Sequence, residues 1–260
     1  MLENLKNIPV VLDLRKIIFE NKFSTHTNVN YFRGVYNSFS EAELSSPKTK
    51  PKGYDNSESA ALYKERTNTT YSTDYPVLFW MNKYKSDISN VFDFGGHIGV
   101  HYYSFSKLLD FSGIKNWTVC DVPSVAEEGK KYAKQRGAKN LNFVSNIQDL
   151  ADQDLFLASG SLQYLDWEIH DKLFELKKFP KYLIFNMLPL HSSTSTITLQ
   201  SIGTAFCPYY IRLEKDFIKG LESIGYEVLD LWSNEEKSCH IAFEKERSLN
   251  YYRGLILRLK

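Results

Sequence analysis

The fold is decided by the stretch Val91-Phe92-Asp93-Phe94-Gly95-Gly96-His97-Ile98-Gly99-Val100-His101. A short apolar run breaks into glycines at 95, 96 and 99 and then resumes with helical spacing. This is the pattern of a strand, a tight turn and the start of a helix. Glycine suits such a turn because it accepts positive φ and lets a ligand approach the backbone. The free amides of the following helix favour a carboxylate or a phosphate, so the stretch predicts a ligand-binding turn.

The spacing of the glycines separates two classes of ligand. A dinucleotide-binding turn has Gly-x-Gly-x-x-Gly, but counting from Gly95 places His97 at the second glycine and Val100 at the third. The pattern present, Asp-x-Gly-Gly-x-x-Gly, resembles the first motif of S-adenosylmethionine-dependent methyltransferases, in which the glycines flank the methionine part of the cofactor. His97 occupies the middle position, which is often glycine in those enzymes. The resemblance implies cofactor contacts from Asp93, Gly95, Gly96, His97 and Gly99; a glycine turn without a cofactor is the alternative.

Composition and charge narrow the class of protein. The chain has 260 residues, of which 43% are hydrophobic and 15% aromatic, enough for one large α/β domain. The net charge of +1 does not suggest a nucleic-acid partner or a polybasic membrane patch. Cys120, Cys207 and Cys239 lie far apart and match no metal spacing. Without a signal peptide, a membrane-length apolar run or a metal-binding cluster, the chain is expected to be cytoplasmic and metal-independent, with no membrane insertion.

The chain divides near residue 75. Residues 1–75 carry no sustained period, apart from a short helix expected over 12–19 and another over 60–65. The aromatic-dense segment 31–42 is expected to pack onto the main domain as a lid or cap, and a substrate-facing aromatic wall is the alternative. A helix over 76–85 then leads into residues 76–260, which we expect to form one globular domain.

Strand and helix patterns alternate regularly from Val91, which indicates a parallel sheet with helices on both faces. Expected strands cover 91–94, 117–120, 141–145, 154–158 and 182–188. Asp121 ends the second strand, about twenty residues past the glycine turn, where a carboxylate can hold a ribose diol. It is the expected ribose ligand, followed by Val122, with a loop carboxylate as the alternative. Asn146 and Ile147 follow the third strand and fall near an adenine edge by position.

Polar residues follow the fourth expected strand, in the segment Ser159-Gly160-Ser161-Leu162-Gln163-Tyr164. Ligands of open α/β sheets bind at the carboxyl ends of the strands, so this segment is expected to lie beside the methyl donor. Ser159 and Ser161 are therefore candidate cofactor contacts, and Gln163 and Tyr164 candidate substrate contacts. An ordinary turn is the alternative.

The end of the chain alternates with period two over 226–232 and again over 238–244, joined by a short polar loop. That pattern predicts an antiparallel hairpin. A mostly parallel seven-stranded sheet that ends in an antiparallel hairpin is the usual form of the Rossmann-like class I methyltransferase fold. A dinucleotide-binding sheet generally ends in another parallel strand.

Taken together, these marks resemble a bacterial family of class I S-adenosylmethionine-dependent methyltransferases found in surface-polysaccharide and O-antigen gene clusters. The likeness rests on Gly34-Val35-Tyr36, Gly53-Tyr54-Asp55, Phe92-Asp93-Phe94-Gly95-Gly96, Asp121-Val122-Pro123, Ser159 to Tyr164 and Phe206-Cys207-Pro208-Tyr209. It implies methyl transfer from S-adenosylmethionine to a hydroxyl of a sugar or glycan precursor. A small-molecule or glycan acceptor is therefore the expected partner, and a homodimer is left open.

A sugar hydroxyl needs a base within reach to become a good nucleophile. His191, at the tip of the fifth strand, is the expected base, with a histidine that merely bonds its loop as the alternative. Tyr209 is a second catalytic candidate, while His101 and Tyr210 are candidate substrate contacts. A nicotinamide oxidoreductase is disfavoured by the glycine spacing and the terminal hairpin. A methyltransferase-like subunit without turnover, acting as a partner in a biosynthetic complex, is the non-enzymatic alternative that His97 favours.

Overall fold

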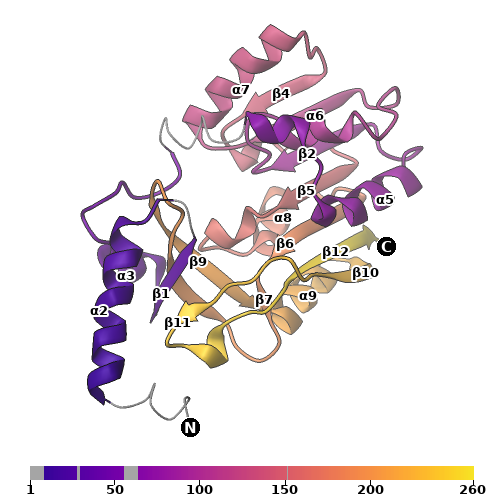
Figure 1. Ribbon diagram of the computed structural model, residues 1–260. Helices are drawn as coiled ribbons and strands as arrows, with labels where there is room; N and C mark the ends of the chain where they lie inside the picture. The colour runs from indigo at the N-terminus through magenta and orange to yellow at the C-terminus, as the bar shows by residue number, and fades with distance from the viewer. Residues whose placement is uncertain (1–8, 28–29, 56–63, 151) are drawn as a thin grey trace.

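The chain forms two β-sheets in the computed structural model, which describes residues 9–27, 30–55, 64–150 and 152–260 (Figure 1). Most of the helix expected over 60–65 lies outside these residues. The helix expected over 12–19 is confirmed as part of α2 (Pro9–Thr25). Within the described residues, no helix is both long enough and apolar enough to span a membrane.

The larger sheet has seven strands in the order β10-β12-β6-β5-β2-β3-β4. The strands are β2 (Asn90–Phe94), β3 (Asn116–Cys120), β4 (Leu141–Val144), β5 (Leu155–Ser159), β6 (Tyr182–Leu188), β10 (Tyr226–Asn234) and β12 (Tyr252–Leu259). β2 to β6 pair in parallel, while β12 is antiparallel to both β6 and β10. The mostly parallel sheet with a final antiparallel hairpin is thus confirmed.

The hairpin has a different second strand from the one expected. β10 pairs with β12, Tyr226 opposite Leu259 and Asn234 opposite Tyr252, and not with residues 238–244. Residues 238–244 instead contribute β11 (Ile241–Ala242), which pairs in parallel with β1 (Tyr31–Tyr36) in the other sheet. β12 is buried through its centre, because it lies between two strands of the larger sheet.

Helices cover both faces of the larger sheet. They are α5 (Tyr75–Lys83), α6 (Val100–Phe105), α7 (Pro123–Arg136), α8 (Ile169–Leu176) and α9 (Glu214–Ser223). Alternation along the strands divides the core in two: Val91, Leu155 and Ile184 face one cluster, while Phe92 and Phe156 face the other. Burying each of these side chains contributes about 1.5 to 3 kcal/mol, which fixes the register of the strands.

The second sheet, here called the cap sheet, has the order β11-β1-β8-β9-β7. Its other strands are β1 (Tyr31–Tyr36), β7 (Leu190–His191), β8 (Thr196–Ser201) and β9 (Phe206–Leu213), so three distant parts of the chain build it. Phe23 of α2 packs on it, stacked on Phe206 with ring centroids 5.2 Å apart. The helix α3 (Phe39–Leu44) follows β1. In Figure 1 the N-terminal elements lie to one side of the larger sheet.

Candidate functional site

The glycine turn lies between the carboxyl end of β2 and the start of α6. Gly95 and Gly99 have φ of 77° and 89°, and His97 also takes a left-handed φ of 55°. A Cβ at Gly95 would overlap the Ser161 side chain, and one at Gly96 would overlap the Asp93 carboxylate. The glycines are therefore required by the protein's own packing around the turn, in addition to any approach by a ligand.

Beneath the turn, Asp93 is fully buried and holds two partners. His101 Nδ1 lies 3.0 and 3.1 Å from its two carboxylate oxygens, and Trp117 Nε1 donates to Oδ2 at 3.2 Å. Burial alone would lower the pKa of His101, but the Asp93 charge and hydrogen bond outweigh burial and raise that pKa. Because Nδ1 faces Asp93, the other ring nitrogen, Nε2, remains for a further contact.

Asp121 bridges the glycine turn and the start of α7. Its Oδ2 accepts a hydrogen bond from the backbone N–H of His97 at 2.9 Å, and its Oδ1 accepts one from the N–H of Val122 at 2.8 Å. Burial raises the pKa of Asp121 to about 6, although these two amides act in the opposite direction. Each carboxylate oxygen has a second lone pair, so the side chain can still accept from a hydroxyl.

The segment after β5 closes against the same turn. Ser161 Oγ donates to the backbone carbonyl of Phe94 at 2.7 Å, which joins the ends of β5 and β2. Gln163 is buried, and its Nε2 donates to the carbonyl of Gly160 at 2.7 Å. No group in the described chain donates to Gln163 Oε1. A buried amide oxygen without a donor is costly, so this atom suits a ligand that carries N–H or O–H.

An aromatic wall connects this segment to the cap sheet. The ring centroid of Tyr54 lies 6.4 Å from that of His97 and 6.3 Å from that of Tyr164. Tyr164 donates its hydroxyl to Gln200 Oε1 of β8 at 2.9 Å. Nearby, Asp55 accepts from the backbone N–H of Ser124 at 3.1 Å. The N-terminal segment therefore reaches the glycine turn and the start of α7.

Tyr209 lies inside the cap sheet rather than at its surface. Only 1% of it is exposed, and its hydroxyl lies 2.7 Å from that of Tyr252. Its ring packs edge-on against Phe32 and Tyr164. Burial raises the pKa of Tyr209 well above its ordinary value. These contacts fit a packing role and not the expected catalytic one. Tyr210 lies on the other face of β9, and the guanidinium carbon of Arg212 lies 4.5 Å from the centre of its ring.

His191 is held by its own loop. Its Nδ1 accepts from the backbone N–H groups of Ser193 and Thr194 at 3.1 and 3.2 Å. The neutral ring then carries its hydrogen on Nε2, so its lone pair is already used. A general base must offer a free lone pair, and this geometry matches the alternative of a loop-bonding histidine. Where β7 pairs with β9, His191 lies opposite Leu213, the last residue of β9. Phe206, the first residue of β9, forms an isolated bridge with Lys52 at the other end of that strand.

The structure therefore gathers most of the expected residues at the carboxyl ends of β2, β3 and β5. The residues at these strand ends, in the loops that follow or in the adjoining helices are Asp93, Gly95, Gly96, His97, Gly99, His101, Asp121, Val122, Ser159, Ser161, Gln163 and Tyr164. Asn146 and Ile147 follow β4, where Asn146 accepts from the N–H of Gln148 at 3.1 Å. Among the described residues, no three His, Cys, Asp or Glu side chains form a group that could hold a metal ion.

Sequence reasoning missed two contributors to this region. Tyr54 was visible only as part of Gly53-Tyr54-Asp55, a pattern without periodicity. Asn186 lies fully buried in β6, and its side chain donates to Thr73 O and Ser159 Oγ at 3.0 and 3.2 Å. A polar residue within an otherwise apolar strand was the signal for Asn186.

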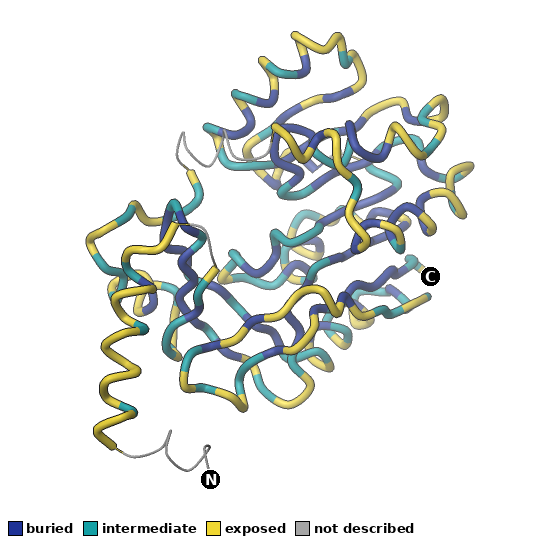
Figure 2. Tube along the Cα trace, in the orientation of Figure 1, coloured by how far each residue is buried: buried dark blue, intermediate teal, exposed yellow. Residues whose placement is uncertain are grey.

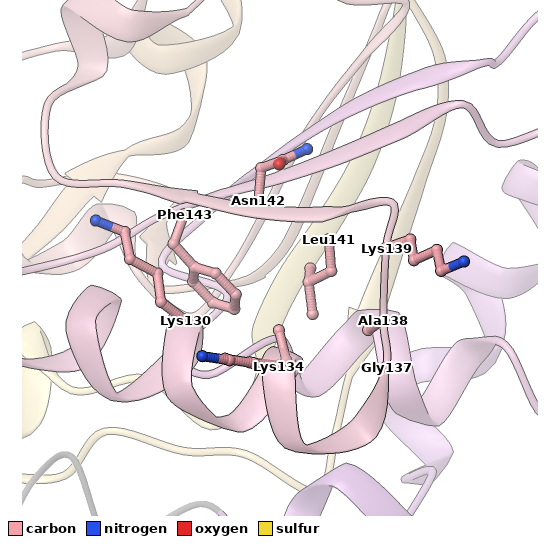
Figure 3. A pocket seen from close by; sticks show the side chains of 9 residues that line it. Lys130, Lys134, Gly137, Ala138, Lys139, Leu141, Asn142 and Phe143 are labelled. Atoms are coloured by element: carbon pink, nitrogen blue, oxygen red, sulfur yellow. The ribbon is translucent and has the colours of Figure 1, made fainter.

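A separate pocket lies at the end of α7 and the start of β4 (Figure 3). Lys130, Lys134 and Lys139 line it together with Leu141 and Phe143. Figure 3 shows the lysine side chains pointing in different directions rather than converging on one point. The pocket is not lined by the glycine turn or Asp121, so it is separate from the candidate site.

No family model and no curated protein matches this chain. Solved structures do match. A Listeria monocytogenes protein named as a candidate S-adenosylmethionine-dependent methyltransferase gives a TM-score of 0.51 at 14% identity, over 73% of this chain and 99% of that one. The N-terminal domain of EvdMO1, solved in the presence of S-adenosylhomocysteine and D-fucose, gives 0.50 at 10% identity, over 74% and 85%. The likeness shows the fold, which is that of class I methyltransferases.

Proposed function

We propose that this chain is an S-adenosylmethionine-dependent methyltransferase that methylates a hydroxyl of a sugar or surface-glycan precursor. The observation that carries the proposal is the position of Asp121. Its desolvated carboxylate is fixed by amides of His97 and Val122 beside the glycine turn, at the carboxyl end of β3. A carboxylate with free lone pairs at that point suits a ribose diol.

The residues around Asp121 fit the rest of the cofactor. Bound S-adenosylmethionine would supply an electrophilic methyl group on its sulfonium. The glycine turn and Val122 would line the ribose and methionine parts, and Asn146 and Ile147 the adenine. His101 has its Nδ1 on Asp93, so its Nε2 is available to a carboxylate or to the acceptor. Ser161 Oγ joins the end of β5 to the end of β2, so Ser159 and Ser161 would lie beside the donor.

The acceptor would lie between the glycine turn and the cap sheet. Tyr54 and Tyr164 offer ring faces, and Gln163 Oε1 offers an acceptor to a hydroxyl or amide of the substrate. A wall of aromatic rings with a few polar atoms suits the apolar faces and hydroxyl edges of a sugar. The proposed lid is residues 1–75, whose described part brings Tyr54 to this wall.

A histidine would take the proton of the acceptor hydroxyl as the methyl transfers in line. His191 was the expected base, and it would serve only if Ser193 and Thr194 released Nδ1. The pairing with Asp93 favours His101 as a second candidate, since the carboxylate orients Nδ1 and leaves Nε2 free to accept. The pH dependence of kcat distinguishes the two candidates. Replacing the histidine that is the true base should abolish the rise in kcat with increasing pH.

One observation favours a different function, a methyltransferase-like subunit without turnover. His97 takes a left-handed φ at a position that is often glycine in methyltransferases, and its side chain is buried beside the turn. Such a subunit would bind the cofactor but release no S-adenosylhomocysteine with any acceptor.

Transfer is tested by incubating the chain with methyl-labelled S-adenosylmethionine and a panel of free sugars, nucleotide sugars and amino sugars. We expect label in a sugar hydroxyl, and a KM for that sugar raised about tenfold by Tyr164→Ala, the scale of one lost stacking contact. Phe174→Ala, at a 66% exposed position on α8, is the matched control and leaves KM unchanged. Cofactor binding with no label in any acceptor would support the subunit instead.

A further inference from the structure

One arginine, Arg212, lies buried in the cap sheet. The inner strands β8 and β9 of this sheet run mostly through buried positions (Figure 2). Arg212 is near the end of β9 and is only 4% exposed. Among the residues that the structure describes, no other lysine or arginine is buried. Burying a guanidinium is unfavourable unless its charge and its N–H groups find partners, so the contacts of Arg212 explain its place.

All three nitrogens of the Arg212 guanidinium donate to one segment, residues 162–168, which joins β5 to α8. The acceptors are backbone carbonyls and one carboxylate: Leu162 O at 2.8 Å from Nη1, Leu165 O and Trp167 O at 3.1 and 2.9 Å from Nη2, and Glu168 Oε2 at 2.8 Å from Nε. A guanidinium presents its N–H groups in a rigid planar fork. These contacts, here called the Arg212 clamp, therefore hold the segment at one position against β9.

The clamped segment depends on outside contacts for its orientation. It begins with a 3₁₀ helix of 3 residues, Leu162–Tyr164. A helix this short has poor hydrogen-bond geometry of its own. Just before it, Ser161 Oγ donates to Phe94 O at 2.7 Å and fixes one end to β2. Arg212 fixes the helix and the residues after it to the cap sheet.

We propose that Arg212 is a positioning residue for the acceptor site. The clamped segment carries Gln163 and Tyr164, the proposed acceptor contacts, and Arg212 holds their backbone between the glycine turn and the cap sheet. Arg212 acts through these residues, because its own N–H groups are directed at the segment. The positioning role rests on the proposed function, whereas the clamp itself does not.

Tyr164 links the clamp to the acceptor. Its hydroxyl donates to Gln200 Oε1 of β8 at 2.9 Å, and its ring centroid lies 5.5 Å from that of Tyr209 in β9. The cap sheet thus contacts the side chain of Tyr164 while Arg212 holds the backbone around it. A shift of the segment would move this ring relative to the donor, and a displacement of about 1 Å is enough to impair catalysis. The glycine turn and Asp121 would keep their own contacts.

The variant Arg212→Lys tests the positioning role, because lysine keeps the charge but cannot present the planar fork. We expect the KM for the acceptor sugar to rise about tenfold, as for loss of the Tyr164 ring itself. The Kd for S-adenosylhomocysteine should stay unchanged. A merely structural role would lower stability and leave the KM of the folded enzyme as it was. An unchanged KM, or an equal loss of S-adenosylhomocysteine affinity, overturns the proposal.

Arg258→Lys is the matched control. Arg258 also pairs with a glutamate, Glu227, at 2.6 Å, but it lies opposite Tyr182 at the start of β6. That is the amino end of the strand, away from the clamped segment. This variant should leave the acceptor KM and the S-adenosylhomocysteine Kd unchanged. Circular dichroism checks that both lysine variants fold.

A double variant tests whether Arg212 acts through Tyr164. Substitutions that act through one contact are not additive in free energy. We therefore expect Arg212→Lys to raise KM little further in a Tyr164→Ala background. Independent effects would multiply to about a hundredfold, and that result overturns the proposed route.

Hydrogen exchange tests the clamp without any acceptor. Peptides covering 162–168 should exchange faster in Arg212→Lys than in the wild type, whereas peptides of the glycine turn should exchange at the same rate. Glu168→Ala, which removes one contact of the clamp, should give a smaller rise and serves if Arg212→Lys does not fold. Unchanged exchange in the folded variants overturns the clamp. A wild type that labels no acceptor overturns the proposed function and the positioning role, while faster exchange would still establish the clamp.

Discussion

At His101, a single side chain connects the glycine turn to the buried core. Its Nδ1 pairs with Asp93, whose other contact is the indole of Trp117. The imidazole therefore fixes a carboxylate that would otherwise be buried with little compensation. This pair is the point at which the chemistry of the site and the stability of the fold depend on the same residue.

The His101 pair predicts a particular dependence of stability on pH. Asp93 raises the pKa of His101 in the folded state, against the effect of burial. A raised folded pKa means that the charged pair stabilises fully below the unfolded pKa of about 6.5 and loses that contribution as pH rises through the folded pKa. His101→Asn should therefore lower the free energy of unfolding by about 3 kcal/mol under mildly acidic conditions, and by less at alkaline pH.

Chemical denaturation across a series of pH values measures this difference. His240, an exposed histidine, supplies the control variant His240→Asn, which should track the wild type at every pH. If the cost of His101→Asn were the same in acid and in alkali, the ion pair with Asp93 would not be the source of the stability.

At the scale of the element, the glycine turn depends on its own side chains for its shape. A Cβ at Gly96 would overlap the Asp93 carboxylate, and the turn runs on into α6, which carries His101. Gly113 offers a comparison, because its nearest neighbour is the Lys85 carbonyl oxygen at 4.0 Å.

Gly96→Ala should therefore destabilise the fold by about 1 to 3 kcal/mol, the cost of forcing an extra carbon into a packed site. Gly113→Ala should stay within about 0.5 kcal/mol of the wild type. Urea unfolding of the two variants provides the measurement. Equal urea midpoints for the two variants would show that the turn can accommodate a Cβ at position 96. Packing against Asp93 would then not explain why this residue is glycine.

The elements that could be predicted are those with local patterns. The strands between 91 and 188 can be predicted from apolar runs between turns, and Asp121 from its position after the second of these strands. The sequence assigns the wrong partner to β10 because 238–244 alternates like one strand of a hairpin. The true partner, β12, has a continuous apolar run over 255–257 that is buried on both faces, so its pattern does not mark it as a hairpin strand. Gln163 was found from its position after a strand, but its unpaired oxygen depends on packing that no local pattern encodes.

At the scale of the whole molecule, the cap sheet was the largest feature hidden from the sequence. β1, β8 and β11 come from distant segments, and each becomes a strand only because the others are its neighbours. The aromatic residues of 31–42 predicted packing onto the main domain but not the sheet itself. The larger sheet, in contrast, follows from repeated strand and helix units, whose connections are short and right-handed.

The central proposal is that Asp121 and the glycine turn hold S-adenosylmethionine. The direct test is calorimetric titration of S-adenosylhomocysteine into the wild type and Asp121→Ala, with NADH as a control ligand. We predict micromolar binding that Asp121→Ala weakens by about 1 to 3 kcal/mol, the scale of a ribose left without its acceptor. The wild-type affinity should also rise as pH passes about 6, where Asp121 ionises. A folded wild type that binds no S-adenosylhomocysteine, or binds NADH equally well, would contradict the account.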